Sequence, residues 1–172
     1  MKASLECLAL IKYFEGCRLR SYPDPGTGAQ PWTIGYGATG SEIGPGVVWD
    51  QQRADDRLDG DVTMRDGDAN NAIKVVVTQG QYDAFISILF NIGHGSPVKD
   101  GIIRLKNAYP STLLRKLNAA DYDGARAEFV RWCSPGTNVS AGLLTRRKAE
   151  QLLWDGLSAA DAIAGVQAIE GT

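Results

Sequence analysis

Residues 14–24 read FEGCRLRSYPD and residues 32–37 read WTIGYG, and these two stretches decide how the rest of the chain is interpreted. The first stretch begins where a helical pattern ends. Apolar side chains recur at three-residue steps over 5–14, with Ser4 as a suitable N-cap and Gly16 as a suitable stop. We therefore predict a helix over 5–14 that delivers the first stretch at its C-terminal end.

The character of the chain changes after this helix. Residues 17–46 contain seven glycines and four prolines, whereas Trp32, Ile34 and Tyr36 alternate in a way that suits a short strand. This composition predicts a small, turn-rich β-sheet lobe over about 17–46.

Helical spacing returns at Asp50. Thr78 and Gln81 form a capping box, Val77 and Tyr82 occupy the hydrophobic-staple positions, and an apolar stripe follows as far as Gly93. The predicted helices after the β lobe are 50–62, 78–93, 111–118, 122–132, 143–155 and 158–169.

A length of 172 residues favours one domain with a sizeable core. We predict an α+β fold in which a mainly helical body, 5–14 and 50–156, is joined to the β lobe, with a cleft between the two and a tail over 157–172. The first helix should pack on the C-terminal body, because no other core is large enough to cover its apolar face.

Charge and composition exclude several classes of function. A net charge of −2 gives no basic field for nucleic acid, and His94 as the single histidine excludes a multi-histidine metal site. The carboxylates of the acidic segment 50–68 lack the loop order of a calcium site, so we expect neither metal nor cofactor. The three cysteines lack metal-binding spacing and are expected to be reduced, buried thiols. The apolar run 8–11 is too short for a signal peptide or a membrane span.

Two carboxylates in the first stretch could carry chemistry. Glu15 lies at the negative end of the helix dipole, which favours its protonated form, whereas Asp24 lies in a proline-flanked polar turn that favours the ionised form. Such a contrast suits glycoside hydrolysis, in which one carboxyl group protonates the leaving oxygen. By spacing alone, however, a Glu and an Asp nine residues apart are usually surface charges.

The motifs around this pair resemble the phage-type lysozyme family, glycoside hydrolase family 24, to which the lysozyme of T-even phages belongs. The resemblance starts with FEG at 14–16, YPDP at 22–25 and WTIGYG at 32–37. It continues in the same order over about 5–156, through 78–93, 111–118, 129–132 and GLLTRRKAE at 142–150.

The resemblance implies roles for particular residues. Glu15 matches the general acid of the family, Asp24 its second carboxylate, and Thr33 the hydroxyl that helps to place the hydrolytic water. Asn91 matches a polar position that faces the cleft, and an arginine of the last motif, Arg146 or its neighbour, is expected near the acid. The other interpretations are a strand-forming threonine, a helix cap at the asparagine and surface charge at the arginine. His94 has no motif support and is interpreted as a solvated loop residue.

The implied reaction is hydrolysis, with inversion, of the β-1,4 bond between N-acetylmuramic acid and N-acetylglucosamine in peptidoglycan. The implied partner is the glycan strand, and we expect a cofactor-free monomer that binds no nucleic acid and does not insert stably into membranes. It would accumulate in the host cytoplasm until a separate membrane-permeabilising protein releases it. The alternatives are a lytic transglycosylase and a lysozyme-like protein that binds peptidoglycan without cutting it.

Three features depart from the pattern of the family. Eight residues separate Asp24 from Thr33, which is a longer loop than is usual. Ala38 follows the GYG run, where histidine is common, and the link over 96–110 is also long. The first departure is what keeps the binding-only alternative open.

Overall fold

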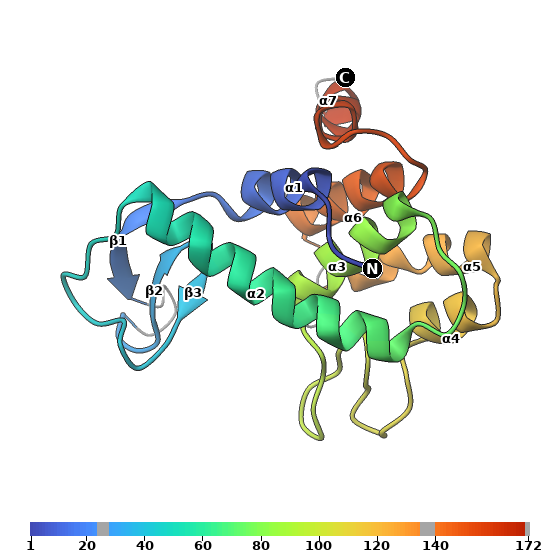
Figure 1. The fold of residues 1–172 in the computed structure, drawn as a ribbon, viewed down its shortest axis with the longest axis horizontal. Helices are drawn as coiled ribbons and strands as arrows, with labels where there is room; N and C mark the ends of the chain where they lie inside the picture. Colours follow the sequence, from blue (N-terminus) through green and yellow to red (C-terminus); the bar gives the residue numbers. More distant parts are fainter. Residues whose placement is uncertain (24–27, 135–139, 171–172) are drawn as a thin grey trace.

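The computed structural model describes residues 1–23, 28–134 and 140–170, and it places a small sheet at one end of the molecule and a helical body at the other (Figure 1). A long helix, α2, leads from the sheet into the body. This arrangement confirms the predicted α+β fold with a small β lobe.

The sheet consists of β1 (Arg18–Pro23), β2 (Trp32–Gly35) and β3 (Ala38–Thr39), which are antiparallel in that order. It has a small hydrophobic cluster of its own, separate from the core of the helical body. The buried members of this cluster are Ile34, Ala38, Ile43, Trp49 and Ala54. Because Ala54 belongs to α2, the lobe is packed onto the first turns of that helix.

Helix α2 (Gln51–Ala72) begins at the predicted cap, where a side-chain oxygen of Asp50 accepts a hydrogen bond from the amide of Arg53 at 2.7 Å. It continues ten residues beyond the predicted end at 62. Its apolar pattern is weak, but Arg57 forms an ion pair with Asp61 one turn later, and such pairs support a mainly solvated helix. With 22 residues, α2 is about 33 Å long.

The helical body is built around α3, whose capping box between Thr78 and Gln81 is present as predicted. The tail forms a helix, as expected, and so does the segment behind Ser111. The elements of the body are α1 (Leu5–Glu15), α3 (Gln79–Ile92), α4 (Thr112–Asn118), α5 (Tyr122–Ala127), the 3₁₀ helix η1 (Phe129–Trp132), α6 (Ala141–Trp154) and α7 (Ala159–Glu170).

Two predicted helices have different bounds. The prediction of one continuous helix over 122–132 was wrong. Helix α5 ends at Ala127, and the chain then tightens into η1, which buries Phe129. Helix α6 starts two residues before the predicted position, because the side chain of Ser140 caps it by accepting from the amide of Leu143 at 3.4 Å.

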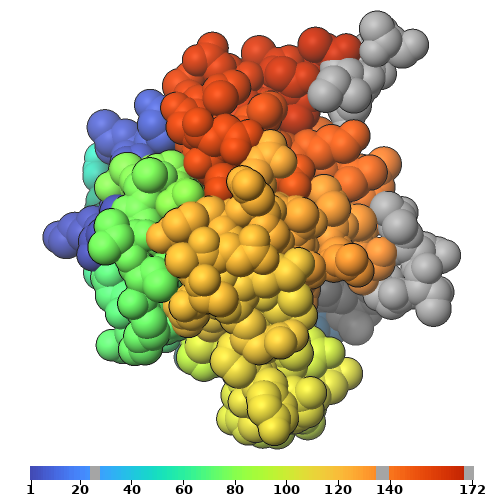
Figure 2. Space-filling model, turned by 90° about the vertical axis from the view of Figure 1, so that its right-hand side faces the viewer, coloured from blue at the N-terminus to red at the C-terminus, as the bar shows by residue number. Residues whose placement is uncertain are grey.

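The long link over 93–110 contains no helix or strand and projects from the body (Figure 2). An isolated antiparallel bridge joins Ser96 to Lys99 within it. The link begins at the end of α3 and therefore leaves the body beside the cleft described below.

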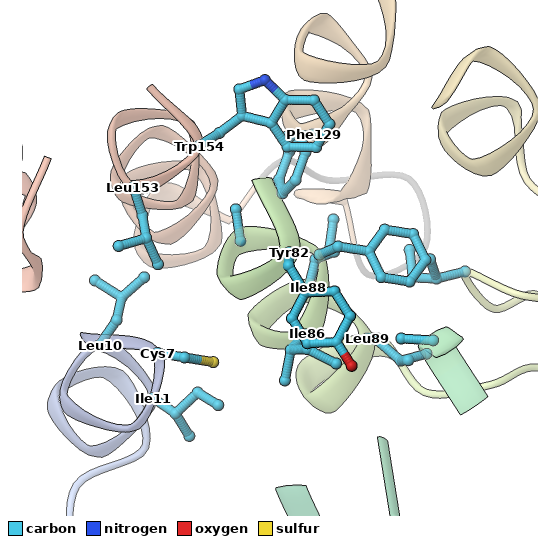
Figure 3. Packing of buried hydrophobic residues seen from close by; sticks show 14 of the residues in the cluster. Cys7, Leu10, Ile11, Tyr82, Ile86, Ile88, Leu89, Phe129, Leu153 and Trp154 are labelled. Carbon is cyan, nitrogen blue, oxygen red and sulfur yellow. The ribbon is translucent and has the colours of Figure 1, made fainter. Parts of the chain in front are cut away.

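The N-terminal helix packs against the body, as expected from its apolar face. Leu10 of α1 points toward Leu153 of α6, while Cys7 and Ile11 point toward α3 (Figure 3). Cys7, Leu10 and Ile11 are fully buried in the main core, and burying a side chain the size of leucine contributes about 1.5–3 kcal/mol to folding. This packing holds α1 on α3, which also carries α6, and so places Glu15 at the end of α1 within reach of α6.

Helix α7 covers the outer side of α1. The amide of Ala159 donates to Glu6 Oε2 at 2.6 Å, and Gln167 Nε2 donates to the hydroxyl of Tyr13 at 2.8 Å. Ala162 is fully buried in this contact. The C-terminal helix thus contacts two turns of the helix that carries Glu15.

Candidate active site

Glu15 is the last residue of α1, and its position follows from the way that helix ends. Gly16 adopts a φ of 65°, a left-handed conformation that glycine accepts without a steric penalty, and its amide still donates to Lys12 O at 3.1 Å. The chain then turns into β1. A Cβ placed on Gly37 would lie 3.8 Å from Glu15 Oε2, so the GYG turn passes beside the carboxyl group. The two decisive stretches of sequence therefore meet at Glu15.

The cleft expected between the lobes is present as a cavity of about 400 Å³, and a second cavity of about 630 Å³ adjoins it within the helical body. Both cavities are lined by Glu15 and Asn91, so these residues stand where the two meet. The larger cavity lies between α1 and the start of α6, and the smaller one between α2 and the β lobe. Further lining residues are Tyr13, Leu143, Thr145 and Arg146 in the first, and Tyr36, Thr39, Arg57 and Met64 in the second.

Arg146 holds the carboxyl group of Glu15. Its Nη1 donates to Glu15 Oε1 at 2.6 Å, and the guanidinium lies 5.7 Å from the ring centroid of Phe14. The Arg146 side chain is 4% exposed and that of Glu15 is 22% exposed, so the pair is set into the wall of the cleft. The structure thereby selects Arg146 over Arg147 as the arginine beside Glu15, and the surface-charge interpretation of Arg146 was wrong.

Asn91 lies in the last turn of α3, and Gly93 is the C-cap of that helix, so the interpretation of Asn91 as a cap was wrong. Its Oδ1 accepts from Arg147 Nη2 at 2.6 Å. Arg147 is fully buried, and burial, with the neighbouring charge of Arg146, lowers the pKa of its guanidinium below the usual value.

Two polar residues beneath the cleft, Glu150 and Ser87, were assigned no role in the sequence analysis. Glu150 is fully buried; its Oε1 accepts from Arg146 Nε at 3.2 Å and from the hydroxyl of Ser87 at 2.8 Å. Its Oε2 lies 3.2 Å from Arg147 Nε, an ion pair without the alignment of a hydrogen bond. The spacing of Arg146, Arg147 and Glu150 on one helix was the signal that could have revealed this cluster.

The remaining predicted site residues are less closely placed. Asp24 lies outside the described residues. Thr33 lies in β2 and pairs with Thr39 in β3, so the two side chains share a face of the sheet. Thr39 lines the smaller cavity, whereas Thr33 lines neither of the two. The roles predicted for Asp24 and Thr33 therefore stay predictions.

The single histidine and the three cysteines line neither cavity. His94 is an exposed loop residue, as expected, with Nδ1 3.6 Å from Asp68 Oδ2. All three cysteines are free thiols, but the prediction that they are buried was wrong for Cys17, which is exposed in the link between α1 and β1, outside both hydrophobic clusters.

Over residues 1–23, 28–134 and 140–170, no group of three or more His, Cys, Asp and Glu side chains is arranged to hold a metal ion. Within the same ranges, no helix combines the length and the apolar character that a membrane span requires.

Comparison with known proteins decides the family. The model of the phage lysozyme family matches residues 12–150, which include both stretches of sequence around Glu15 and the Arg146 motif. The chain belongs to the phage lysozyme family. It is 39% identical over 159 residues to the endolysin of Acyrthosiphon pisum secondary endosymbiont phage 1, with 90% of this chain and 99% of that protein covered.

Solved structures with a similar fold include an endolysin and a muramidase domain. The endolysin from Escherichia coli O157:H7 phage FAHEc1 superimposes with a TM-score of 0.76 at 29% identity, covering 92% of this chain and 96% of that one. The muramidase domain of SpmX from Asticaccaulis excentricus gives 0.74 at 31% identity, covering 89% and 97%. Some relatives are longer: the chain spans 55% of the endolysin of Bacillus phage PZA, to which it is 38% identical.

Proposed function

We propose that this phage lysozyme is an endolysin that cuts the glycan strands of bacterial peptidoglycan during host cell lysis, with Glu15 as the general acid. Membership of the family makes the chain a lysozyme-type glycoside hydrolase. The observation that supports the proposed site is the position of Glu15 where the two cavities meet, paired with the nearly buried Arg146. A carboxyl group there can reach a strand that fills both cavities.

In the proposed reaction, the bond cut is the β-1,4 linkage from N-acetylmuramic acid to N-acetylglucosamine. Glu15 protonates the glycosidic oxygen as the bond breaks, while Asp24 and Thr33 act on the water that attacks the opposite face of the sugar. Attack from that side inverts the anomeric carbon, so the first product carries an α-anomeric reducing end. Asn91 and Arg146 line the cleft, which supports their roles as substrate contacts.

The protein is proposed to act without a cofactor and as a monomer, and to reach the wall from the host cytoplasm once a separate protein has permeabilised the membrane. Fractionation of producing cells, with and without such a permeabilising protein, tests the last point. Recovery of the chain in the periplasm without that partner would contradict it.

The decisive experiment compares Glu15→Gln with the unmodified protein on purified peptidoglycan, by counting new reducing ends. Glutamine keeps the shape of the side chain and its acceptor for Arg146 but cannot donate the proton, so the rate should fall by about 10²–10⁴-fold. Asp59→Asn is the matched control, because it neutralises an exposed carboxylate on α2 that lines neither cavity, and it should retain full activity.

Mass spectrometry of the released fragments separates the alternatives. Anhydro-muropeptides would identify a lytic transglycosylase, and wall binding without new ends would identify a binding protein. Undiminished hydrolysis by a folded Glu15→Gln variant would remove Glu15 from the mechanism.

A further inference from the structure

Three charged side chains on α6 lie beneath the cleft. Arg146 is 4% exposed, while Arg147 and Glu150 are fully buried. Charges at this depth persist when they are paired, because burying an isolated charge costs far more than folding can supply. The partners of each charge therefore show how the cluster is stabilised.

Glu150 faces both guanidiniums, whereas Glu15 faces one. Arg146 divides its donors, with Nε to Glu150 Oε1 at 3.2 Å and Nη1 to Glu15 Oε1 at 2.6 Å. Arg147 lies 3.2 Å from Glu150 Oε2 and donates to Asn91 from its other side. Arg146 Nη2, two nitrogens of Arg147 and Glu150 Oε2 are buried with no hydrogen-bond partner, so the cluster is held together largely by charge rather than by aligned hydrogen bonds.

The charge balance of this cluster bears on the proton of Glu15. When Glu15 is ionised, two guanidiniums meet two carboxylates, and when it is protonated the cluster carries one excess positive charge. The arginines alone thus favour ionised Glu15, which is the wrong form for a general acid. Glu150 opposes them, because its negative charge occupies Arg146 from below and repels a second negative charge on Glu15.

We propose that Glu150 is a positioning residue that shares Arg146 with Glu15 and so weakens the hold of that guanidinium on the proton-donating carboxyl group. This inference rests on the proposed role of Glu15 as the acid. Ser87 fixes the Glu150 carboxylate by donating to it at 2.8 Å. The spacing of Arg146, Arg147 and Glu150 on α6 would then serve catalysis as well as stability.

Other charged groups around the cluster are engaged elsewhere. Lys12, on the same helix as Glu15, pairs with Asp55 at 2.9 Å, and Arg57 across the cleft pairs with Glu42 and Asp61. Burial raises the pKa of the Cys7 thiol, which faces Glu150 from α1, well above its usual value, so this thiol stays neutral. Further groups near the cluster are the Cys133 thiol beside Arg147, the Tyr36 hydroxyl and Arg65 in the smaller cavity, and the exposed thiol of Cys17.

The test is the alkaline limb of the pH–rate profile for peptidoglycan hydrolysis, recorded from about pH 4 to about pH 9. Glu150→Gln keeps the size of the side chain and an acceptor for Ser87 but removes the negative charge. We expect its alkaline limb to move to lower pH by about one unit or more. Arg147→Met removes a positive charge from the same cluster, so we expect its limb to move to higher pH.

Shifts of the alkaline limb in opposite directions for the two variants are the signature of an electrostatic role. A defect in packing would lower the rate of both variants without shifting their limbs in opposite directions. Glu150→Asp should restore the limb by restoring the charge, and Asp59→Asn, which removes an exposed carboxylate that lines neither cavity, should leave it at its original position. If Glu150→Gln fails to fold, the direction of the Arg147→Met shift still decides.

The inference and the proposed function can fail separately. Glu15→Gln should be inactive over the whole pH range, and an active Glu15→Gln would refute the proposed acid. If Glu15→Gln is inactive while the limb of the folded charge variants stays unmoved, or moves in the same direction in both, then Glu15 is the acid and Glu150 does not act on it.

Discussion

Replacing Leu10 by alanine tests whether the N-terminal helix is an integral part of the C-terminal core. Leu10 is fully buried and points from α1 toward Leu153 of α6. The substitution removes three carbon atoms, worth about 2.4 kcal/mol at 0.8 kcal/mol for each buried methylene. The cavity left behind adds to this loss, because densely packed neighbours relax only in part, so unfolding should become easier by about 3–4 kcal/mol.

Urea denaturation followed by circular dichroism measures the change, and for a chain of this length the melting temperature should fall by about 10 °C. Leu5→Ala is the control in the same helix, because Leu5 is 82% exposed, and it should change stability by less than about 0.5 kcal/mol. A loss below about 1 kcal/mol for Leu10→Ala, or an equal loss for both variants, would show that α1 is not held by the core in this way.

Two further predictions concern thiols and glycines. A thiol reagent should label Cys17 in the native protein and reach Cys7 and Cys133 after unfolding, since both are buried and burial also raises the pKa of Cys7; rapid native labelling of all three would contradict the described packing. Gly80→Ala should destabilise by about 1–3 kcal/mol in denaturation, because its Cβ would lie 2.5 Å from a backbone carbonyl of α6. Gly67→Ala, in open space on α2, should instead stabilise by about 0.5–1 kcal/mol, and equal effects of both substitutions would refute the close approach at Gly80.

The parts of the fold that could be predicted from sequence are those whose signals are local. The ends of α1 are marked by Ser4 and Gly16, and the start of α3 by Thr78 and Gln81, because a cap satisfies backbone groups a few residues away. The β lobe was likewise predictable from its glycines and prolines.

Features that depend on distant contacts could not be predicted. The apolar pattern of α2 weakens after Val62, and the last turns of the helix are kept by burying Ala69 in the main core. Nothing near Asn91 in sequence shows that it receives a hydrogen bond from Arg147. The indirect link of Glu150 to Glu15 through Arg146 exists because α1 and α6 both pack on α3. The family motif could indicate an arginine near Glu15, but the choice between two adjacent arginines needed the geometry of the helix.

The packing of α1 also determines when the site can form during synthesis. Glu15 and Arg146 are 131 residues apart in sequence, and the contacts of α1 with α7 join residues separated by 153 and 154. During synthesis α1 leaves the ribosome long before the helices that hold it, and contacts of such separation form late because long loops must close first. The pair at the centre of the cleft is therefore absent from a growing chain, and a nascent molecule carries no competent site until α6 has been made and packed against α1.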